Sequence, residues 1–329
     1  MIKHYVQLVR PVNLGVLTLT MLLFRYCIVD VDVLEMYGFK PYLSNVAFWV
    51  LLLVTLLVAA GGYVVNDIMD VDTDRINRGE RLIVEQYIDE NKAFQFYKWL
   101  TGLAVLGSFL LMGLSNQAKI SSIPILVIVL LYLYAQIFKR MALVGNIVVA
   151  VCAALPVILI MLYEMKINEF DSSVIILITR GVGLAALFYG LFAFLTTLIR
   201  EIIKDMEDVE GDMAIDAQTI PIAWGTTAGK VIVVFVQLLT MGLLSFAGLY
   251  LLAIRAKWPF YGFMVLLVLP LLIQLVMVLL AKTPEQFKRA GDLGKWHMLS
   301  GVFSMLYFMS GSAPHFFNEL VNHIAKWLS

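Results

Sequence analysis

Nine long apolar stretches constrain this chain more than any other feature of its sequence. They cover about residues 12–29, 46–66, 95–114, 121–138, 143–163, 174–199, 229–253, 258–281 and 297–315. A helix of roughly 20 apolar residues crosses about 30 Å of hydrocarbon and satisfies its own backbone hydrogen bonds there. Only 15% of the residues are charged, whereas a soluble domain carries about 25%. The sequence therefore predicts an all-α, polytopic membrane bundle of about nine transmembrane helices and excludes a soluble protein.

The basic residues predict which side of the membrane each loop faces. With a cytoplasmic N-terminus, 16 of the 24 lysine and arginine residues fall on the cytoplasmic side, as the positive-inside rule requires. We therefore expect a multi-pass protein of the cell inner membrane. Residues 1–329 are predicted to form a single membrane domain, whose longest polar loops, 67–94 and 200–228, are both cytoplasmic. Because the basic residues are scattered over short loops, no nucleic-acid partner is expected.

Two acidic triplets with the same spacing open those two loops. They are Asp67, Asp70 and Asp74, and Asp205, Asp208 and Asp212. Offsets of 0, 3 and 7 predict three carboxylates on one face of a helix, where like charges destabilise the helix unless cations are bound. Carboxylate oxygens favour hard divalent cations, above all Mg²⁺, usually with phosphate oxygens in the same coordination shell. Both triplets are therefore predicted to bind metal, and the alternative for each is a solvated helix end.

Basic and amide side chains beside the triplets predict an anionic ligand. Asn66 precedes Asp70 by one helical turn, so its amide is expected to join the first acidic face. Arg78, Lys139 and Lys204 lie next to the triplets or at the end of the fourth apolar stretch. Arginine binds phosphate through two parallel hydrogen bonds and lysine supplies a compact positive charge. These residues are candidates for contact with a diphosphate. The alternative for each basic residue is that it only follows the positive-inside rule for cytoplasmic loops.

Three further residues are candidates for the substrate site. Arg10 and Asn13 stand where the first apolar stretch begins, and Tyr134 precedes Lys139 near the end of the fourth. For Arg10, contact with lipid headgroups is the alternative. The amide of Asn13 lies one turn deeper and requires a polar partner in the bundle.

The two motifs together resemble those of the UbiA-type intramembrane prenyltransferases. The first reads Asn66-Asp67-x-x-Asp70-x-x-x-Asp74, followed by Arg75-x-Asn77-Arg78, and the second reads Asp205-x-x-Asp208-x-x-x-Asp212. Within that superfamily, the segment from Arg200 to Asp212 and the later Gln218-Thr219-Ile220-Pro221 are most similar to the digeranylgeranylglyceryl phosphate synthases. Tyr134 through Lys139 and Gly145-Asn146 are similar to that group as well.

The resemblance implies an enzyme of the EC 2.5.1 class that transfers a prenyl group from an allylic polyprenyl diphosphate. It implies that the Asp-rich loops cover a central cavity and bind the diphosphate through Mg²⁺, with two ions expected. All six aspartates are then expected to be metal ligands. Asp70, Asp74, Asp208, Asp212 and Lys139 are expected to take part in catalysis, by stabilising the charge that develops on the leaving diphosphate. The expected acceptor is the hydroxyl of a prenylglyceryl phosphate, in membrane phospholipid synthesis.

Two other functions stay open at this point. One is an aromatic prenyltransferase of quinone biosynthesis, of the 4-hydroxybenzoate type, in which a ring carbon attacks the allyl cation. The other is a divalent-cation transporter that uses the aspartates as its ion path. Transporter ligands are expected near the middle of the membrane, whereas both triplets lie at the ends of apolar stretches. The position of the triplets therefore favours an enzyme.

Overall fold

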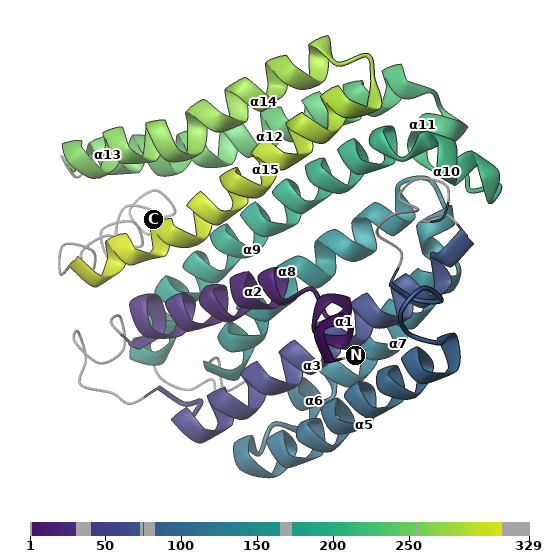
Figure 1. The fold of residues 1–329 in the computed structure, drawn as a ribbon. Helices are drawn as coiled ribbons and strands as arrows, with labels where there is room; N and C mark the ends of the chain where they lie inside the picture. Colours follow the sequence, from purple (N-terminus) through teal and green to yellow (C-terminus); the bar gives the residue numbers. More distant parts are fainter. Residues whose placement is uncertain are drawn as a thin grey trace.

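The computed structural model describes residues 2–30, 41–72, 75, 83–164, 173–253 and 256–310. This part of the chain is a bundle of long helices (Figure 1), and its described residues contain isolated β-bridges but no named strand. Eight helical segments in it are long and apolar enough to cross a membrane: Pro11–Val29, Asn45–Met69, Glu90–Ser115, Ala118–Gln136, Val144–Glu164, Val182–Glu207, Thr226–Leu249 and Lys257–Leu280. The predicted all-α membrane bundle is confirmed.

Helices make up most of the described part of the chain. In chain order they are α1 (Ile2–Leu8), α2 (Pro11–Leu23), η1 (Phe24–Val29), α3 (Asn45–Met69), α5 (Glu90–Ser115), α6 (Ala118–Ser121), α7 (Ile123–Gln136), η4 (Phe138–Arg140), α8 (Val144–Glu164), α9 (Ser173–Glu207), α10 (Val209–Ala214), α11 (Ile220–Ala223), α12 (Thr226–Ala253), α13 (Lys257–Phe263), η5 (Met264–Val268), α14 (Leu269–Leu280), α15 (Pro284–Phe303) and η6 (Ser304–Ser310).

The helix starts follow from local capping chemistry. Ser44 caps α3 by accepting a hydrogen bond from the Ala47 amide at 3.2 Å. Asp89 caps α5 by accepting from the amides of Asn91 and Lys92. These side chains satisfy amides that have no partner inside the helix.

The ninth predicted stretch begins inside a longer helix. Residues 297–310 belong to α15 and η6, and residues 311–315 lie outside the described part of the chain. α15 itself starts at Pro284, where Thr283 and Gln286 form a reciprocal capping box. Its first half carries both acidic and basic residues, so hydropathy alone placed the start too late. The eight spanning segments among the described residues make the predicted count of nine an approximation.

Two long helices hold the bundle together. α3 packs against α2, α5 and α7, and α9 packs against α8, α12 and α15. Figure 1 shows α9, α12, α14 and α15 side by side, with α3, α5 and α7 on the other side of the bundle. Each of these two helices is the second span of its half of the chain, and each leads into one acidic triplet. Asp67 and Asp205, the first aspartates of the two triplets, therefore lie at the ends of these two central helices.

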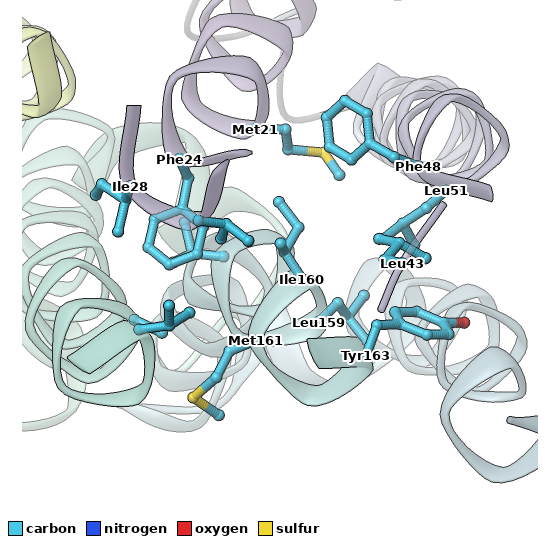
Figure 2. Packing of buried hydrophobic residues seen from close by; sticks show 14 of the residues in the cluster. Met21, Phe24, Ile28, Leu43, Phe48, Leu51, Leu159, Ile160, Met161 and Tyr163 are labelled. Atoms are coloured by element: carbon cyan, nitrogen blue, oxygen red, sulfur yellow. The ribbon is translucent and has the colours of Figure 1, made fainter. Parts of the chain in front are cut away.

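A hydrophobic cluster fills the bundle towards the end remote from the triplets. Figure 2 shows Met21, Phe24, Phe48, Leu51 and Ile160 in it, drawn from α2, η1, α3 and α8. All five are fully buried. Their packing fixes the position of the helices that carry the site.

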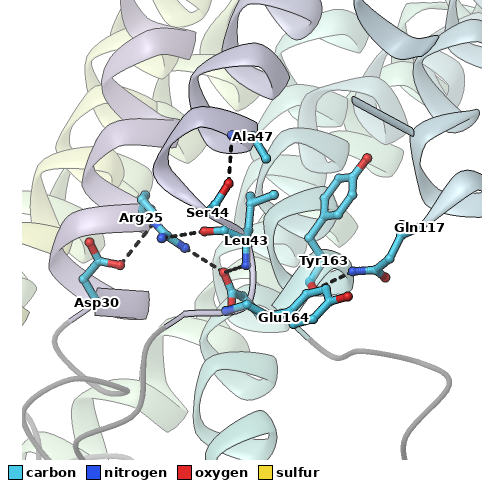
Figure 3. A network of polar contacts seen from close by, with 9 residues as sticks. Arg25, Asp30, Leu43, Ser44, Ala47, Gln117, Tyr163 and Glu164 are labelled. Atoms are coloured by element: carbon cyan, nitrogen blue, oxygen red, sulfur yellow. Dashed lines mark hydrogen bonds and ion pairs between the residues drawn. The ribbon is translucent and has the colours of Figure 1, made fainter. Parts of the chain in front are cut away.

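A buried network of charges lies at that same end (Figure 3). Arg25, 2% exposed, donates to Glu164 Oε1 at 2.6 Å and to the Leu43 carbonyl at 2.8 Å, and pairs with Asp30 at 3.1 Å. The Tyr42 amide donates to Glu164 Oε2 at 2.7 Å. The network joins η1, α8 and the segment before α3. α3 then extends about 37 Å over its 25 residues, which places the network far from Asp70.

Candidate active site

Both central helices are interrupted at the middle aspartate of their triplet. α3 ends at Met69, where Asp70 has φ −98° and ψ 4°, and α9 ends at Glu207, where Asp208 has φ −95° and ψ 13°. These angles are nearly the same and lie in the sparsely populated bridge region, where many active-site residues are found. The prediction of three carboxylates on one continuous helical face is therefore wrong. Closely spaced acidic side chains disfavour a continuing helix.

The predicted loops are more helical than the sequence indicated. Asp67 still belongs to α3, and Val84 and Ile88 form an isolated bridge before α5 begins. The second loop holds the end of α9, then α10, α11 and the start of α12. α10 and α11 lie at one end of the bundle, on the right in Figure 1.

The first motif pairs its carboxylates with positive and amide groups. Lys139 Nζ donates to Asp70 Oδ1 at 2.5 Å, and Asn66 Nδ2 donates to Asp70 Oδ2 at 2.5 Å. The Lys139 side chain is only 9% exposed. Arg10 Nη2 donates to Asp67 Oδ1 at 2.5 Å. The structure thus brings together five residues that the sequence predicted for the site, from three separate segments.

The N-terminal segment approaches this motif in an unusual conformation. Arg10 has φ 52°, in the left-handed region, and its guanidinium lies 5.1 Å from the centre of the Tyr63 ring. Tyr63 also hydrogen-bonds to the side chain of Asn13. A non-glycine residue in this region costs energy, so its contacts must hold it there. Arg10 and Asn13 therefore lie beside the first motif, as predicted for substrate-site residues.

The second motif is held by α8. Asn146 Nδ2 donates to Asp205 Oδ2 at 2.9 Å. Burial, followed by the neighbouring carboxylate of Asp208, raises the pKa of Asp212 to about 6, while Lys204 acts in the opposite direction. The three aspartates and Lys204 therefore interact electrostatically within one small region.

The two motifs meet through the beginning of α8 and the segment before it. Lys139, which binds Asp70, lies against Gly145, where an added Cβ would be 2.9 Å from the Lys139 Cα. The next residue, Asn146, binds Asp205 of the other motif. The carboxylate of Asp70 contributes to the raised pKa of Asp212, which places both within electrostatic range. The two motifs therefore face one common region.

Two further contacts support this convergence. The Gln218 amide, which follows the second motif, donates to the Arg140 carbonyl at 2.8 Å. The hydroxyl of Tyr134 lies within electrostatic range of Asp70, Asp205 and Arg10. Tyr134 therefore lies between the motifs, where the sequence predicted substrate contact.

The donor groups fit a hard divalent cation. Within the part of the chain that the structure describes, no three His, Cys, Asp or Glu side chains are arranged to hold a metal by themselves. Mg²⁺ usually takes one or two carboxylates, with water and substrate phosphates completing its shell. The side-chain amide oxygen of Asn66, Oδ1, is buried and has no hydrogen-bond partner among the described residues, so it is suited to act as a neutral oxygen ligand. The first motif accordingly offers an amide oxygen beside Asp70.

Two predicted site residues cannot be placed, and one residue was missed. Asp74 and Arg78 lie outside the described residues. Glu201, four residues before Asp205 on α9, is 8% exposed and pairs with Arg200 at 2.7 Å. A carboxylate one turn deeper than an acidic motif, near the end of an apolar stretch, was the signal that could have identified it.

The fold and this site define a multi-pass membrane enzyme of the prenyl-transferring class. The UbiA prenyltransferase family model matches residues 36–299, and the chain belongs to that family. It is thus a transferase of the EC 2.5.1 kind. The chain is 31% identical to the digeranylgeranylglyceryl phosphate synthase of Methanothermobacter thermautotrophicus, over 76% of each chain. It is 29% identical to that of Methanosphaera stadtmanae, over 72% of this chain and 74% of the relative.

Solved structures share the fold. A digeranylgeranylglyceryl phosphate synthase structure matches with a TM-score of 0.60 and 20% identity, covering 93% of this chain and 99% of the other. A UbiA homologue from Archaeoglobus fulgidus, bound to DMAPP and Mg²⁺, matches with a TM-score of 0.52 and 16% identity, covering 92% and 98%. These matches confirm a UbiA-type helical bundle.

Proposed function

We propose that this enzyme transfers a polyprenyl group from an allylic diphosphate to the hydroxyl of a prenylglyceryl phosphate, which is a step of ether-lipid synthesis. The observation that carries the proposal is the convergence of two acidic motifs on one region that also contains Lys139 and Lys204. The relatives named digeranylgeranylglyceryl phosphate synthase support a geranylgeranyl donor and a geranylgeranylglyceryl phosphate acceptor. The UbiA homologue bound to DMAPP and Mg²⁺ supports a prenyl diphosphate with a divalent cation.

We base the residue roles on the two sequence motifs and on the contacts described above. We assign the metal-ligand role to the six aspartates, with Asn66 as a neutral ligand: Asp67, Asp70, Asp74, Asp205, Asp208 and Asp212. We assign contact with the diphosphate to Lys139, Lys204 and Arg10. Arg78, which lies outside the described residues, is assigned the same role. Lys139 and Arg10 already lie within 2.5 Å of motif carboxylates. A diphosphate that bridges the metal ligands would therefore contact these cations without any long movement.

The chemistry proposed for the site is heterolysis of the bond between C1 and the diphosphate oxygen. Divalent ions, two in the proposed arrangement, would supply positive charge to the leaving diphosphate. Lys139 and Lys204 stabilise the same charge as it develops, which lowers the barrier more than uniform substrate binding does. The apolar interior of the bundle excludes water from the allyl cation. Tyr134 and Asn13 line the region in which the acceptor then attacks.

Product analysis tests this proposal directly. Purified protein in lipid nanodiscs is incubated with Mg²⁺, geranylgeranyl diphosphate and either geranylgeranylglyceryl phosphate or 4-hydroxybenzoate. Mass spectrometry should detect the diether phosphate and no prenylated benzoate, and EDTA should abolish the product. A prenylated benzoate alone would instead identify an aromatic prenyltransferase. Metal uptake into proteoliposomes without any prenyl transfer would identify a transporter.

The same proposal places the site on the cytoplasmic face of the inner membrane. The excess of basic residues on that side supports this orientation. Both motifs lie at the ends of their spanning helices, where water-soluble Mg²⁺ has access. A cysteine introduced at exposed Glu210 and treated with a membrane-impermeant reagent would test this orientation. The reagent should label the cysteine in inverted vesicles and not in intact cells.

A further inference from the structure

One buried carboxylate lies next to the acidic motifs without belonging to either. Glu201 is in α9 and is 8% exposed. Arg200 Nη1 donates to Glu201 Oε1 at 2.7 Å. This bond engages Oε1, and among the described residues no hydrogen bond to Oε2 is found. A buried carboxylate with a free acceptor oxygen is suited to binding a substrate hydroxyl.

The carboxylate of Glu201 faces the interior of the bundle. Tyr134 on α7 and Tyr63 on α3 both lie within electrostatic range of it, and so does Asp205. α9 itself packs against α8, α12 and α15, and Glu201 is 8% exposed. The packed helices therefore bury the carboxylate. It does not face lipid.

The depth of Glu201 matches that of the reacting carbon. Four residues of helix span about 6 Å, so Glu201 lies about one turn farther into the membrane than Asp205. In the proposed function the diphosphate is held at the acidic motifs. C1 is bonded directly to a diphosphate oxygen, and the prenyl chain continues into the apolar bundle. The reacting carbon therefore lies on the membrane side of the motifs, at the level of Glu201.

We propose that Glu201 accepts the proton of the acceptor hydroxyl during prenyl transfer. The bond between C1 and the diphosphate oxygen breaks, and its electron pair leaves with the diphosphate. A lone pair of the acceptor oxygen forms the new bond to C1, and the O–H electron pair stays on that oxygen as its proton moves to Glu201 Oε2. Arg200 holds the carboxylate in place through Oε1. This inference rests on the proposed function.

Glu201→Gln tests this role against a purely structural pairing with Arg200. The variant keeps the size of the side chain and removes the proton acceptor. Two reactions of the Mg²⁺-loaded protein in nanodiscs are compared: transfer of geranylgeranyl diphosphate to geranylgeranylglyceryl phosphate, and slow hydrolysis of the donor without acceptor. Donor binding is measured in parallel. Glu210→Gln, on exposed α10, is the matched control.

Transfer by Glu201→Gln should fall by about 10²- to 10⁴-fold, the usual contribution of a general base. Donor binding and donor hydrolysis should stay within about threefold of wild type, because ionisation of the donor needs no base. Glu210→Gln should behave like wild type in all three measurements. If Glu201→Gln does not fold, Glu201→Asp takes its place in the test. The aspartate side chain is one methylene group shorter, so its carboxylate lies farther from the acceptor hydroxyl. This variant should transfer more slowly and hydrolyse the donor at the wild-type rate.

Two results would overturn the inference alone. One is a wild-type rate of transfer in Glu201→Gln, and the other is a parallel loss of donor binding and hydrolysis, which would indicate a structural role. A wild-type protein that transfers nothing to the hydroxyl acceptor would instead overturn the proposed function, and this inference with it.

Discussion

At the scale of single residues, Asp212 shows how burial and a neighbouring carboxylate change the protonation of the candidate site. The pKa of Asp212, about 6, is above its ordinary value of 3.8, first because of burial and then because of Asp208. The folded protein therefore holds this proton more tightly than the unfolded chain does. The resulting stability is fully present below about pH 4 and is lost as the pH rises to about 6. A bound cation would offset that loss.

The first prediction concerns Asp212→Asn. In EDTA at about pH 8 the variant should unfold at a higher temperature than wild type, because it lacks the unfavourable buried charge. The difference should shrink as the pH falls from about 6 to about 5. With saturating Mg²⁺ and prenyl diphosphate, wild type should gain more stability than the variant. Thermal unfolding in detergent measures the unfolding temperature of both proteins under all these conditions. A difference in unfolding temperature between wild type and variant that does not change with pH would contradict this explanation.

Several residues of the candidate site could be predicted from the sequence, whereas their contacts could not. Lys139 and the aspartates were candidates because charges at the ends of apolar helices are conspicuous. The bond between Asn146 and Asp205 joins residues 59 positions apart, and no local pattern encodes it. Glu201 was overlooked because a charge near a helix end has an ordinary topological explanation.

At the scale of elements, the beginning of α8 connects the two motifs. Gly145 leaves room for the backbone of η4: an added Cβ would be 2.7 Å from the Phe138 carbonyl oxygen and 2.9 Å from the Lys139 Cα. Both contacts are with backbone atoms, which cannot move aside as a flexible side chain can. Glycine is therefore needed here for close approach.

The second prediction is that Gly145→Ala lowers kcat/KM by about 10- to 100-fold, because a displacement of roughly 1 Å at the site can cost that much. The added methyl group should shift Lys139 away from Asp70. Gly113→Ala is the matched control, since α5 leaves open space around Gly113. Steady-state prenyl transfer measures both variants. Equal activity of the two would show that η4 adjusts without moving Lys139.

The interruption of both central helices was the main error of sequence-based reasoning at this scale. Spacing of 0, 3 and 7 fits one helical face. The apolar pattern ends at residues 66 and 199, and it did not show that the helices themselves end at Met69 and Glu207. Asp70 and Asp208 have matching backbone angles, and each lies at the point where the chain leaves one of the two membrane helices. Helix ends depend on tertiary contacts that propensities do not contain.

At the scale of the whole molecule, the two ends of the bundle have different chemistry. One end carries the acidic motifs, and the other carries the buried network of Arg25, Glu164 and Asp30 (Figure 3). The all-α membrane architecture and the grouping of the motifs at one end were predictable, because span length and charge position follow from the bilayer itself. The buried network was not predictable, because Arg25 and its partner Glu164 are 139 positions apart and no local pattern links them.

The third prediction is that Arg25→Met destabilises the protein by on the order of 3–5 kcal/mol, because Glu164 would keep a buried charge without its partner. Lys295→Met is the control: it breaks the exposed pair with Asp292 and should cost about 0–1 kcal/mol. Denaturant titration in detergent compares them. The activity per folded molecule of Arg25→Met should match wild type, and a selective loss of turnover would show that the two ends are coupled.

Calorimetric titration of Mg²⁺-loaded protein with geranylgeranyl diphosphate tests most directly whether the two acidic motifs form a single site. We expect one diphosphate bound per chain, with binding lost to a similar extent in Asp70→Asn and in Asp208→Asn and no further loss in the double variant. Two diphosphates bound per chain, or wild-type affinity in either single variant, would contradict the account.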